Sequence, residues 1–324
     1  MKSVKEALRD RWRRPVTVGD LATARQVVLV HTTQWGKIPG GLQQRLPEGW
    51  ALTTDRRVCD RATAVVCHIP TLLRPPRWQS TARRWVAWSA ESAANYPQLS
   101  DAAYMRRFDV TMTYRMDSDI PISYLFENDT GVPLTEFVRP VPAKQPDRLV
   151  ALLISSDVDT SGRLPYLKEL MRHIDVHSYG SVLNNRPLPG PDLGSASKLA
   201  LLSGYRFNLA FENSLCRDYV TEKLYDPLRA GCVPVYLGAP NVSSFVPGER
   251  CCIYVGDYES PRALADHLRR LAADEEAYAA YFAWKAQPLR PEFRRLASSC
   301  SEPLGVRLCR WLASHPPGAI GPAL

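Results

Sequence analysis

Long apolar runs are missing from the sequence. No stretch of its 324 residues approaches the roughly 18 consecutive apolar residues that a membrane-spanning helix needs. The N-terminus also lacks a charged start followed by an apolar core, the pattern of a secretory signal peptide. We therefore expect neither feature within this sequence.

Spacings typical of metal sites are missing as well. The 8 cysteines include no Cys-x-x-Cys pair, so a zinc site is not expected. His173 and His177 have the spacing of helical neighbours, but His177 falls in a predicted strand, so they predict no metal pair. Most cysteines lie in apolar runs and are expected in the core. Cys300 and Cys309 could form a disulfide in an oxidising compartment, which the sequence leaves open.

Positively charged residues outnumber negatively charged ones. The net charge is +8 and the isoelectric point about 9.1, which suits nucleic acid, anionic lipid or a phosphorylated small molecule, or a basic solvated surface. No basic stripe interleaved with aromatic residues is found, so we expect no nucleic-acid partner. Residues 1–25 form a basic segment. Its apolar face is thin, so a surface helix is expected, although peripheral membrane contact stays open.

The first half of the chain alternates strand and helix patterns. Apolar runs that end in polar residues predict strands at 26–30, 63–69, 84–88 and 108–114, and residues 101–107 read as a helix. This alternation indicates an α/β fold with a mainly parallel sheet.

The pattern restarts after a proline-rich stretch, which we interpret as a linker at 141–148. The predicted domains are an α/β domain at 26–140, a second α/β domain at 149–300 and a C-terminal tail at 301–324. Two such halves suggest two facing Rossmann-like domains, which bind ligands at the carboxyl ends of their strands. Further elements are expected in the second half, with strands at 149–154, 175–179, 207–211 and 233–237 and helices at 165–173, 221–230 and within 260–284.

The densest polar signal follows the predicted strand at 207–211. Glu212 and Asn213 end that strand, and Thr221 can cap a helix whose first turn contains Glu222 and Lys223. A helix start offers free backbone N–H groups and a positive dipole end, so it suits an anion. Lys223 adds a cation, and Glu222 can accept hydrogen bonds from ribose hydroxyls. An isolated Glu-Lys pair would be a solvated helix face, but the strand–loop–helix context favours a phosphate site.

Three segments together resemble the signature of the α1,3-fucosyltransferases, glycosyltransferase family 10. Residues 207–214 are similar to its F-x-x-x-F-E-N-S motif, 219–224 to Y-[VI]-T-E-K-[LIF], and 233–240 to V-P-V followed by G-x-P. Residues 85–92, 114–119 and 257–265 resemble further family segments, so the likeness extends over about 60–310.

The resemblance implies a GT-B arrangement of two Rossmann-like domains, in which the C-terminal half binds GDP-fucose and the N-terminal half serves the acceptor. It also implies an inverting transfer of L-fucose to a hydroxyl of a glycan or glycoconjugate, with O3 of N-acetylglucosamine as our expected position. GDP-fucose would be the donor substrate, and no cofactor or metal is expected. A complete chain would be cytoplasmic, whereas a trimmed eukaryotic one would act in the Golgi lumen in protein glycosylation.

The resemblance also assigns roles to residues. The donor-binding positions are Arg163, Glu212, Asn213, Tyr219, Glu222 and Lys223. Arg163 would bind the pyrophosphate, although Ser155-Ser156-Asp157 stands where the family usually has Asn.

Glu91 is the predicted general base, because it follows a strand end and an inverting transfer needs one carboxylate on the acceptor side. Trp85 and Trp88 are expected to form a dry wall beside it, and Glu127 is the alternative carboxylate. Asp117 and Asp119 are expected to cap a turn.

Other functions remain open from the residues alone. A GT-B enzyme with another nucleotide sugar donor and an inactive glycan-binding homologue both fit the two-domain pattern. The acceptor is also open. The stretch from Ile69 lacks the His-His-Arg run of Lewis-type members, and residues 91–97 are more similar to members that fucosylate the innermost GlcNAc of N-glycans.

Overall fold

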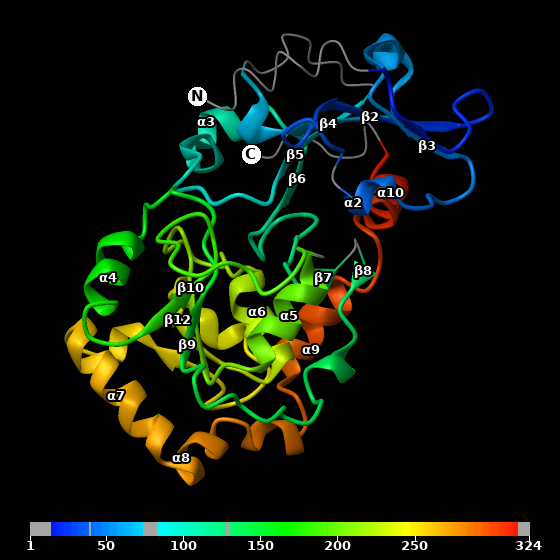
Figure 1. Cartoon of the computed structure of the whole chain (residues 1–324). Helices are drawn as coiled ribbons and strands as arrows, with labels where there is room; N and C mark the ends of the chain where they lie inside the picture. The colour runs from blue at the N-terminus through cyan, green and yellow to red at the C-terminus, as the bar shows by residue number, and fades with distance from the viewer. Residues whose placement is uncertain (1–13, 39, 74–82, 128–129, 193, 317–324) are drawn as a thin grey trace. The chain divides into compact units, whose positions relative to one another are not determined.

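The computed structural model describes residues 14–38, 40–73, 83–127, 130–192 and 194–316 (Figure 1). The chain forms two compact units, and residues 1–13 of the predicted basic segment lie outside the description. Unit 1 comprises Met1–Ile122, Phe126–Gly131 and Ser299–Leu324, and unit 2 comprises Ser123–Leu125 and Val132–Ser298. Each unit contains a mainly parallel sheet with helices, which confirms the predicted α/β fold class with two Rossmann-like domains.

The sheet of unit 1 has the strand order β1-β3-β2-β4-β5-β6. Its strands are parallel except for β1, which pairs with β3 in the antiparallel direction. The predicted strands are confirmed, whereas the short strands β1 and β3 were missed. The strands are β1 (Thr17–Val18), β2 (Gln26–Thr32), β3 (Trp50–Thr53), β4 (Ala64–His68), β5 (Arg84–Ser89) and β6 (Val110–Thr113).

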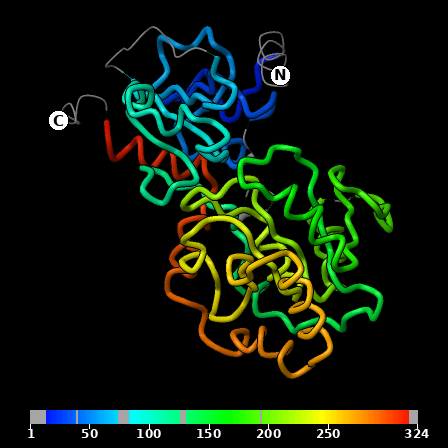
Figure 2. The backbone as a smooth tube through the Cα atoms, turned by 90° about the vertical axis from the view of Figure 1, so that its left-hand side faces the viewer, coloured from blue at the N-terminus to red at the C-terminus, as the bar shows by residue number. Residues whose placement is uncertain are grey.

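The C-terminal helix α10 (Leu304–Ser314) belongs to unit 1, so residues 301–316 are not a separate tail. Its Leu308 and Leu312 are buried in the same core cluster as Val28 of β2, and Figure 2 shows the red C-terminal segment in the same unit as the blue N-terminal residues. The short helix α2 (Gly40–Gln43) adds Leu42 to that cluster. The opposite face of the sheet is covered by residues around α3 (Ala102–Met105).

The sheet of unit 2 is parallel throughout, in the order β10-β9-β11-β12-β13. In chain order this is 2-1-3-4-5, a doubly wound arrangement whose direction reverses between β9 and β11. The strands are β9 (Val150–Leu152), β10 (Val176–Ser178), β11 (Phe207–Phe211), β12 (Val233–Leu237) and β13 (Ile253–Tyr254).

Helices cover both faces of this sheet (Figure 1). Apolar side chains of α4 (Arg163–Leu170) and α7 (Pro261–Ala273) pack on one face, and those of α5 (Ser195–Ser203) and α6 (Glu222–Ala230) pack on the other. The remaining elements are α8 (Glu275–Ala280), α9 (Pro291–Ser299) and the hairpin of β7 (Phe126–Glu127) with β8 (Thr130–Gly131).

The proline-rich stretch is part of unit 2 and does not act as the boundary predicted at 141–148. Lys144 Nζ donates hydrogen bonds to the carbonyl oxygens of Ser203, at 2.9 Å, and Gly231, at 2.5 Å. The boundaries between the units instead fall near residues 122–132 and at 298–299. Side-chain contacts of this kind leave no local signal, so composition alone misplaced the boundary.

Within the described ranges, no helix combines the length and hydropathy needed to cross a membrane. All 8 cysteines fall within these ranges and none forms a disulfide, including Cys300 and Cys309.

Candidate active site

Two loops meet at the carboxyl edge of the unit 2 sheet, beside the reversal between β9 and β11. The Ser161 hydroxyl donates to the carbonyl oxygen of Glu212 at 2.7 Å, and the Thr160 N–H donates to that of Asn213 at 2.9 Å. Ligands of doubly wound sheets bind at such a reversal. The structure therefore joins Glu212 and Asn213 to the loop that leads into Arg163.

Arg163 is fastened beneath these loops. Its side chain is almost fully buried, with 1% exposed. Nη1 donates to the carbonyl of Phe211 at 2.9 Å, and Nη2 donates to those of Ser156 and Val158 at 2.8 and 3.1 Å. Its Nε has no hydrogen-bond partner among the described residues. The guanidinium thus has a structural role that the sequence did not predict, and its contact with pyrophosphate stays a prediction.

The first turn of α6 confirms the predicted cap. Thr221 Oγ1 accepts a hydrogen bond from the backbone N–H of Lys223 at 3.4 Å. The carboxylate of Glu212, which is fully buried, accepts from the Thr221 N–H at 2.7 Å and from its hydroxyl at 2.8 Å. Lys223 Nζ donates to Thr221 Oγ1 at 3.0 Å and to Glu222 Oε1 at 3.2 Å, and lies 3.4 Å from Glu212 Oε2. Hydrogen bonds therefore join Glu212 at the end of β11, the capping residue Thr221 and the Lys223 ammonium.

Burial and the neighbouring charges together determine the pKa values of Glu212, Glu222 and Lys223. Burial raises the pKa of Glu212, an effect that Lys223 partly offsets. Burial also works against the charge of Glu222, but Lys223 and Lys198 hold the pKa of Glu222 at about 2. The pKa of Lys223 is raised despite burial, because Glu222 and Glu212 stabilise its ammonium form. Glu222 is therefore an anion and Lys223 a cation at neutral pH.

One further ion pair and one further hydrogen-bonded pair in unit 2 were missed by sequence reasoning. Lys198 on α5 donates to the buried carboxylate of Asp226 on α6 at 2.8 Å. The Asn241 side chain accepts from the Asp218 N–H at 2.9 Å and donates to the Asp218 carboxylate at 2.8 Å. Tertiary packing brings the two residues of each pair together, and no spacing in the sequence predicts either pair.

The Tyr219 ring is buried in unit 2 and meets the Tyr124 ring edge-on, with centroids 6.3 Å apart.

Gly238 follows β12 and leaves room for the Tyr236 ring, because a Cβ at Gly238 would lie 2.3 Å from the Tyr236 hydroxyl oxygen. The glycine of the G-x-P segment is the sequence feature from which this close approach could have been predicted.

Glu91 lies at the carboxyl edge of the unit 1 sheet, two residues beyond β5. Ser89 Oγ accepts from the Glu91 N–H at 3.0 Å and donates to its carbonyl oxygen at 3.2 Å, and the side chain is partly buried. The predicted wall of two tryptophans is wrong. Trp85 and Trp88 pack into different core clusters, because residues three apart on a strand point to opposite faces.

An aromatic group lies at this same edge instead. His68, at the end of β4, packs against Trp88 with ring centroids 4.5 Å apart, and Trp35 meets His68 at 5.7 Å and Tyr96 at 6.3 Å. Burial and the nearby charge of Glu91 raise the pKa of Tyr96 to about 12. The sequence did not predict this group.

Three other acidic residues that the sequence analysis named also lie in unit 1. Asp119 Oδ2 accepts from the N–H and the hydroxyl of Thr111 on β6 at 2.8 and 2.7 Å, which ties the loop after β6 back to that strand, and the turn cap stays a prediction. Asp117 pairs with Arg115 on the surface. Glu127, the alternative carboxylate, belongs to β7.

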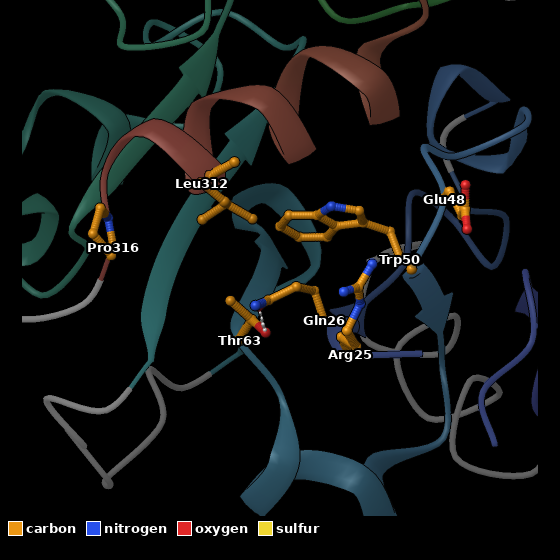
Figure 3. Close-up of a pocket in the computed structure, with 9 residues that line it drawn as sticks. Arg25, Gln26, Glu48, Trp50, Thr63, Leu312 and Pro316 are labelled. Atoms are coloured by element: carbon orange, nitrogen blue, oxygen red, sulfur yellow. Dashed lines mark hydrogen bonds between the residues drawn. The ribbon is translucent and has the colours of Figure 1, made fainter. Parts of the chain in front are cut away.

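A cavity of about 390 Å³ opens at the opposite, amino-terminal edge of the unit 1 sheet (Figure 3). Figure 3 shows the Trp50 ring reaching toward Leu312 across it, with Arg25 and Glu48 alongside. None of the predicted site residues lines this cavity. Open α/β sheets bind ligands at the carboxyl ends of their strands, so we take the carboxyl edge of each unit's sheet as a separate candidate site.

Comparison with known families matches both halves of the chain. The model described as glycosyltransferase family 10 (fucosyltransferase) C-term matches residues 143–316. The model described as fucosyltransferase, N-terminal, matches residues 22–125.

Three relatives represent the similar proteins. The chain is 37% identical over 213 residues to GDP-fucose protein O-fucosyltransferase 3 of Bos taurus, covering 62% of this chain and 44% of the relative. It is 36% identical over 212 residues to alpha-(1,3)-fucosyltransferase B of Drosophila melanogaster, covering 61% and 47%. It is 34% identical over 250 residues to human 4-galactosyl-N-acetylglucosaminide 3-alpha-L-fucosyltransferase 9, covering 74% and 64%. The chain thus spans about half the length of the first two relatives.

Solved structures support the fold. A crystal structure of an alpha1,3-fucosyltransferase has a TM-score of 0.54 at 16% identity, covering 82% of this chain and 83% of that one. A second crystal structure, of an alpha1,3-fucosyltransferase with GDP-fucose, has a TM-score of 0.50 at 16% identity, covering 74% and 76%. The predicted fold class, with two Rossmann-like domains as in GT-B enzymes, is confirmed. With both family models matched and the C-terminal one covering more than half of the sequence, the chain belongs to glycosyltransferase family 10, the fucosyltransferases.

Proposed function

We propose that this chain is an inverting fucosyltransferase that moves L-fucose from GDP-fucose to a glycan hydroxyl, with O3 of N-acetylglucosamine as the position. Family membership supports fucosyl transfer. The names of the Drosophila and human relatives, both 3-fucosyltransferases, support the α1,3 linkage.

The observation that carries the donor assignment is the first turn of α6. Thr221 caps a helix start whose free N–H groups suit an anion, and Lys223 supplies a cation held by Glu212 and Glu222. We infer that this turn binds the pyrophosphate of GDP-fucose. Asn213 and Tyr219 lie on the loop between β11 and α6, and we assign them to the donor as well.

The reaction needs one base and one stabilised leaving group. The acceptor oxygen attacks C1 of fucose while its proton passes to the Glu91 carboxylate. The bond from C1 to the β-phosphate oxygen breaks, so GDP leaves and the β-linked sugar becomes α-linked. Negative charge builds on the β-phosphate during this step, and a fixed Lys223 ammonium stabilises it more in the transition state than in the ground state.

The acceptor has a second candidate. The bovine relative, at 37% identity, is named a protein O-fucosyltransferase, so a Ser or Thr hydroxyl of a protein is the alternative. Both acceptors present a neutral hydroxyl, and the same base would serve either.

The test is a transfer assay with purified chain. GDP-fucose, GDP-mannose and UDP-galactose are each offered with a GlcNAc-terminated glycan, an N-glycan core and a Ser/Thr-containing protein domain. The proposal predicts transfer from GDP-fucose alone, to O3 of GlcNAc, with an α-linked product by NMR. Transfer only to the protein domain would replace the acceptor. Stabilisation by GDP in a thermal-shift assay without transfer to any acceptor would indicate an inactive homologue.

We also propose that transfer needs no metal ion, because Lys223 and the start of α6 supply positive charge to the leaving group. With EDTA in excess, most of the transfer rate should remain. Complete loss that added Mn²⁺ or Mg²⁺ restores would contradict this.

A further inference from the structure

The chain makes a tight turn at Gln34–Lys37, directly after β2. Gln34 and Lys37 exchange two backbone hydrogen bonds, with N–H to carbonyl distances of 2.8 and 2.9 Å. Trp35 has φ 50° and Gly36 has φ 85°. Two successive residues at positive φ make this a type I′ turn.

Trp35 occupies a position in this turn that disfavours it. The first central residue of a type I′ turn is usually Asn, Asp or Gly, because other side chains clash at positive φ. A bulky residue there is a conformational outlier, and such outliers gather at functional sites. Gly36 fits its own position without strain.

Core packing does not account for Trp35. Its ring is only partly buried and is absent from both core clusters of unit 1. It meets His68 edge-on, with an interplanar angle of 81°, and is tilted by 45° against Tyr96. The indole thus stands on other aromatic rings while part of its surface faces solvent.

The His68 ring that packs against Trp35 is hydrogen-bonded and uncharged. Thr71 Oγ1 lies 2.8 Å from His68 Nδ1 and donates to the carbonyl of Thr33 at 2.9 Å, next to the turn. His68 is fully buried, and burial lowers its pKa to about 3, so it is neutral at physiological pH. A fixed, neutral aromatic surface suits a neutral ligand more than an ionic one.

This surface lies on the same sheet edge as Glu91. Strands β2, β4 and β5 are parallel neighbours, so Trp35, His68 and Glu91 follow their carboxyl ends in adjacent positions. The Tyr96 ring lies 6.3 Å from that of Trp35, centroid to centroid, and the charge of Glu91 helps to raise the pKa of the Tyr96 hydroxyl. Tyr96 and Glu91 both follow β5, so the aromatic surface and the predicted base belong to the same edge of the sheet.

We propose that Trp35 is a positioning residue on whose ring the acceptor sugar stacks, so that a sugar hydroxyl is presented to Glu91. This inference rests on the proposed fucosyl transfer and names the part of unit 1 that holds the acceptor. The C–H groups on one side of a pyranose ring carry partial positive charge and pack against the negative face of an aromatic ring. The strained turn is explained if it holds the indole where the sugar binds.

The decisive variant is Trp35→Asn, because Asn is favoured at this turn position. We expect its Tm to equal or exceed that of the parent. The KM for the glycan acceptor should rise at least about tenfold, as for a lost aromatic anchor, while GDP-fucose affinity stays unchanged. Trp35→Phe should show a smaller rise in KM, because it keeps a ring. Trp50→Phe, on the opposite edge of the sheet, is the matched control and should leave the acceptor KM unchanged.

Two results would overturn the inference. One is a lower Tm for Trp35→Asn together with an unchanged acceptor KM, which would make the indole structural. The other is an equal loss of acceptor binding in Trp50→Phe.

Glycan binding without transfer separates this inference from the proposed function. If the parent chain transfers nothing, saturation-transfer NMR with a GlcNAc-terminated oligosaccharide still reports binding. Contact that Trp35→Asn abolishes would support the inference while the proposed activity fails.

Discussion

The parallel strands of the two sheets follow the same 2-1-3-4-5 order once the antiparallel β1 is set aside, but their carboxyl edges differ in chemistry. In unit 2 the edge is charged and hydrogen-bonded, with Glu212 and Arg163 bonded to backbone groups and Lys223 to the Thr221 hydroxyl. In unit 1 the edge is aromatic, with Trp35, His68 and Tyr96 beside one carboxylate, that of Glu91. A charged edge suits a nucleoside diphosphate, and an aromatic edge suits a neutral sugar.

The largest effect is expected on the aromatic edge. Glu91→Gln should lower the single-turnover transfer rate roughly 10²–10⁴-fold, the usual contribution of a positioned base. Donor affinity by calorimetry should not change, because Glu91 belongs to the acceptor side. Glu48→Gln, an exposed acid at the opposite edge of the same sheet, is the control and should transfer normally. Transfer by Glu91→Gln above about a tenth of the parent rate would point to another carboxylate, with Glu127 tested next.

Arg163 should matter for folding. Replacing it with Met removes the hydrogen bonds to the carbonyls of Phe211, Ser156 and Val158. Leaving these buried acceptors unsatisfied should cost on the order of 3 kcal/mol, or about 6–12 °C in Tm. Differential scanning calorimetry measures this, with Arg172→Met on the exposed surface as the control. An unchanged Tm with weakened GDP binding would favour the predicted phosphate contact over the structural role.

Lys223 should matter for catalysis. Lys223→Ala removes the cation at the start of α6 and should lower turnover at saturating GDP-fucose on the order of 10²-fold, as for loss of one preorganised donor. Lys168→Ala, an exposed lysine on α4, is the matched control and should behave as the parent. Near-normal turnover of Lys223→Ala would remove Lys223 from the leaving-group site.

The smallest effect concerns pH. The folded pKa of Glu222, about 2, is below the value of about 4.3 that Glu has in unfolded chains. Charged Glu222 therefore stabilises the fold above about pH 4.3, and this contribution is lost as pH falls toward 2. The Tm difference between parent and Glu222→Gln should narrow between about pH 5 and 2. Glu276→Gln, in the first turn of α8, is the control. A Tm difference that stays constant over this range would contradict the lowered pKa.

The sequence predicted the elements that carry strong local patterns. The apolar strands at 207–211 and 233–237 and the cap at Thr221 all appear as expected. Strand β3 was missed because it has four residues and follows Gly49 without a clear apolar run.

Features that depend on distant contacts left no local signal. The buried role of Arg163, the Lys198–Asp226 pair and the aromatic group around Trp35 each join segments that lie far apart in the chain. The misplaced tryptophan wall had a different cause, since alternation along β5 already separates Trp85 from Trp88.

Hydrogen–deuterium exchange with and without GDP tests the division of the two edges most directly. The account predicts that GDP slows exchange of backbone amides in residues 155–163 and 212–224 of unit 2, where the loops and the start of α6 meet. Residues 31–37 and 89–96 of unit 1 should exchange at an unchanged rate. Protection confined to these unit 1 segments, with none at 212–224, would contradict the account.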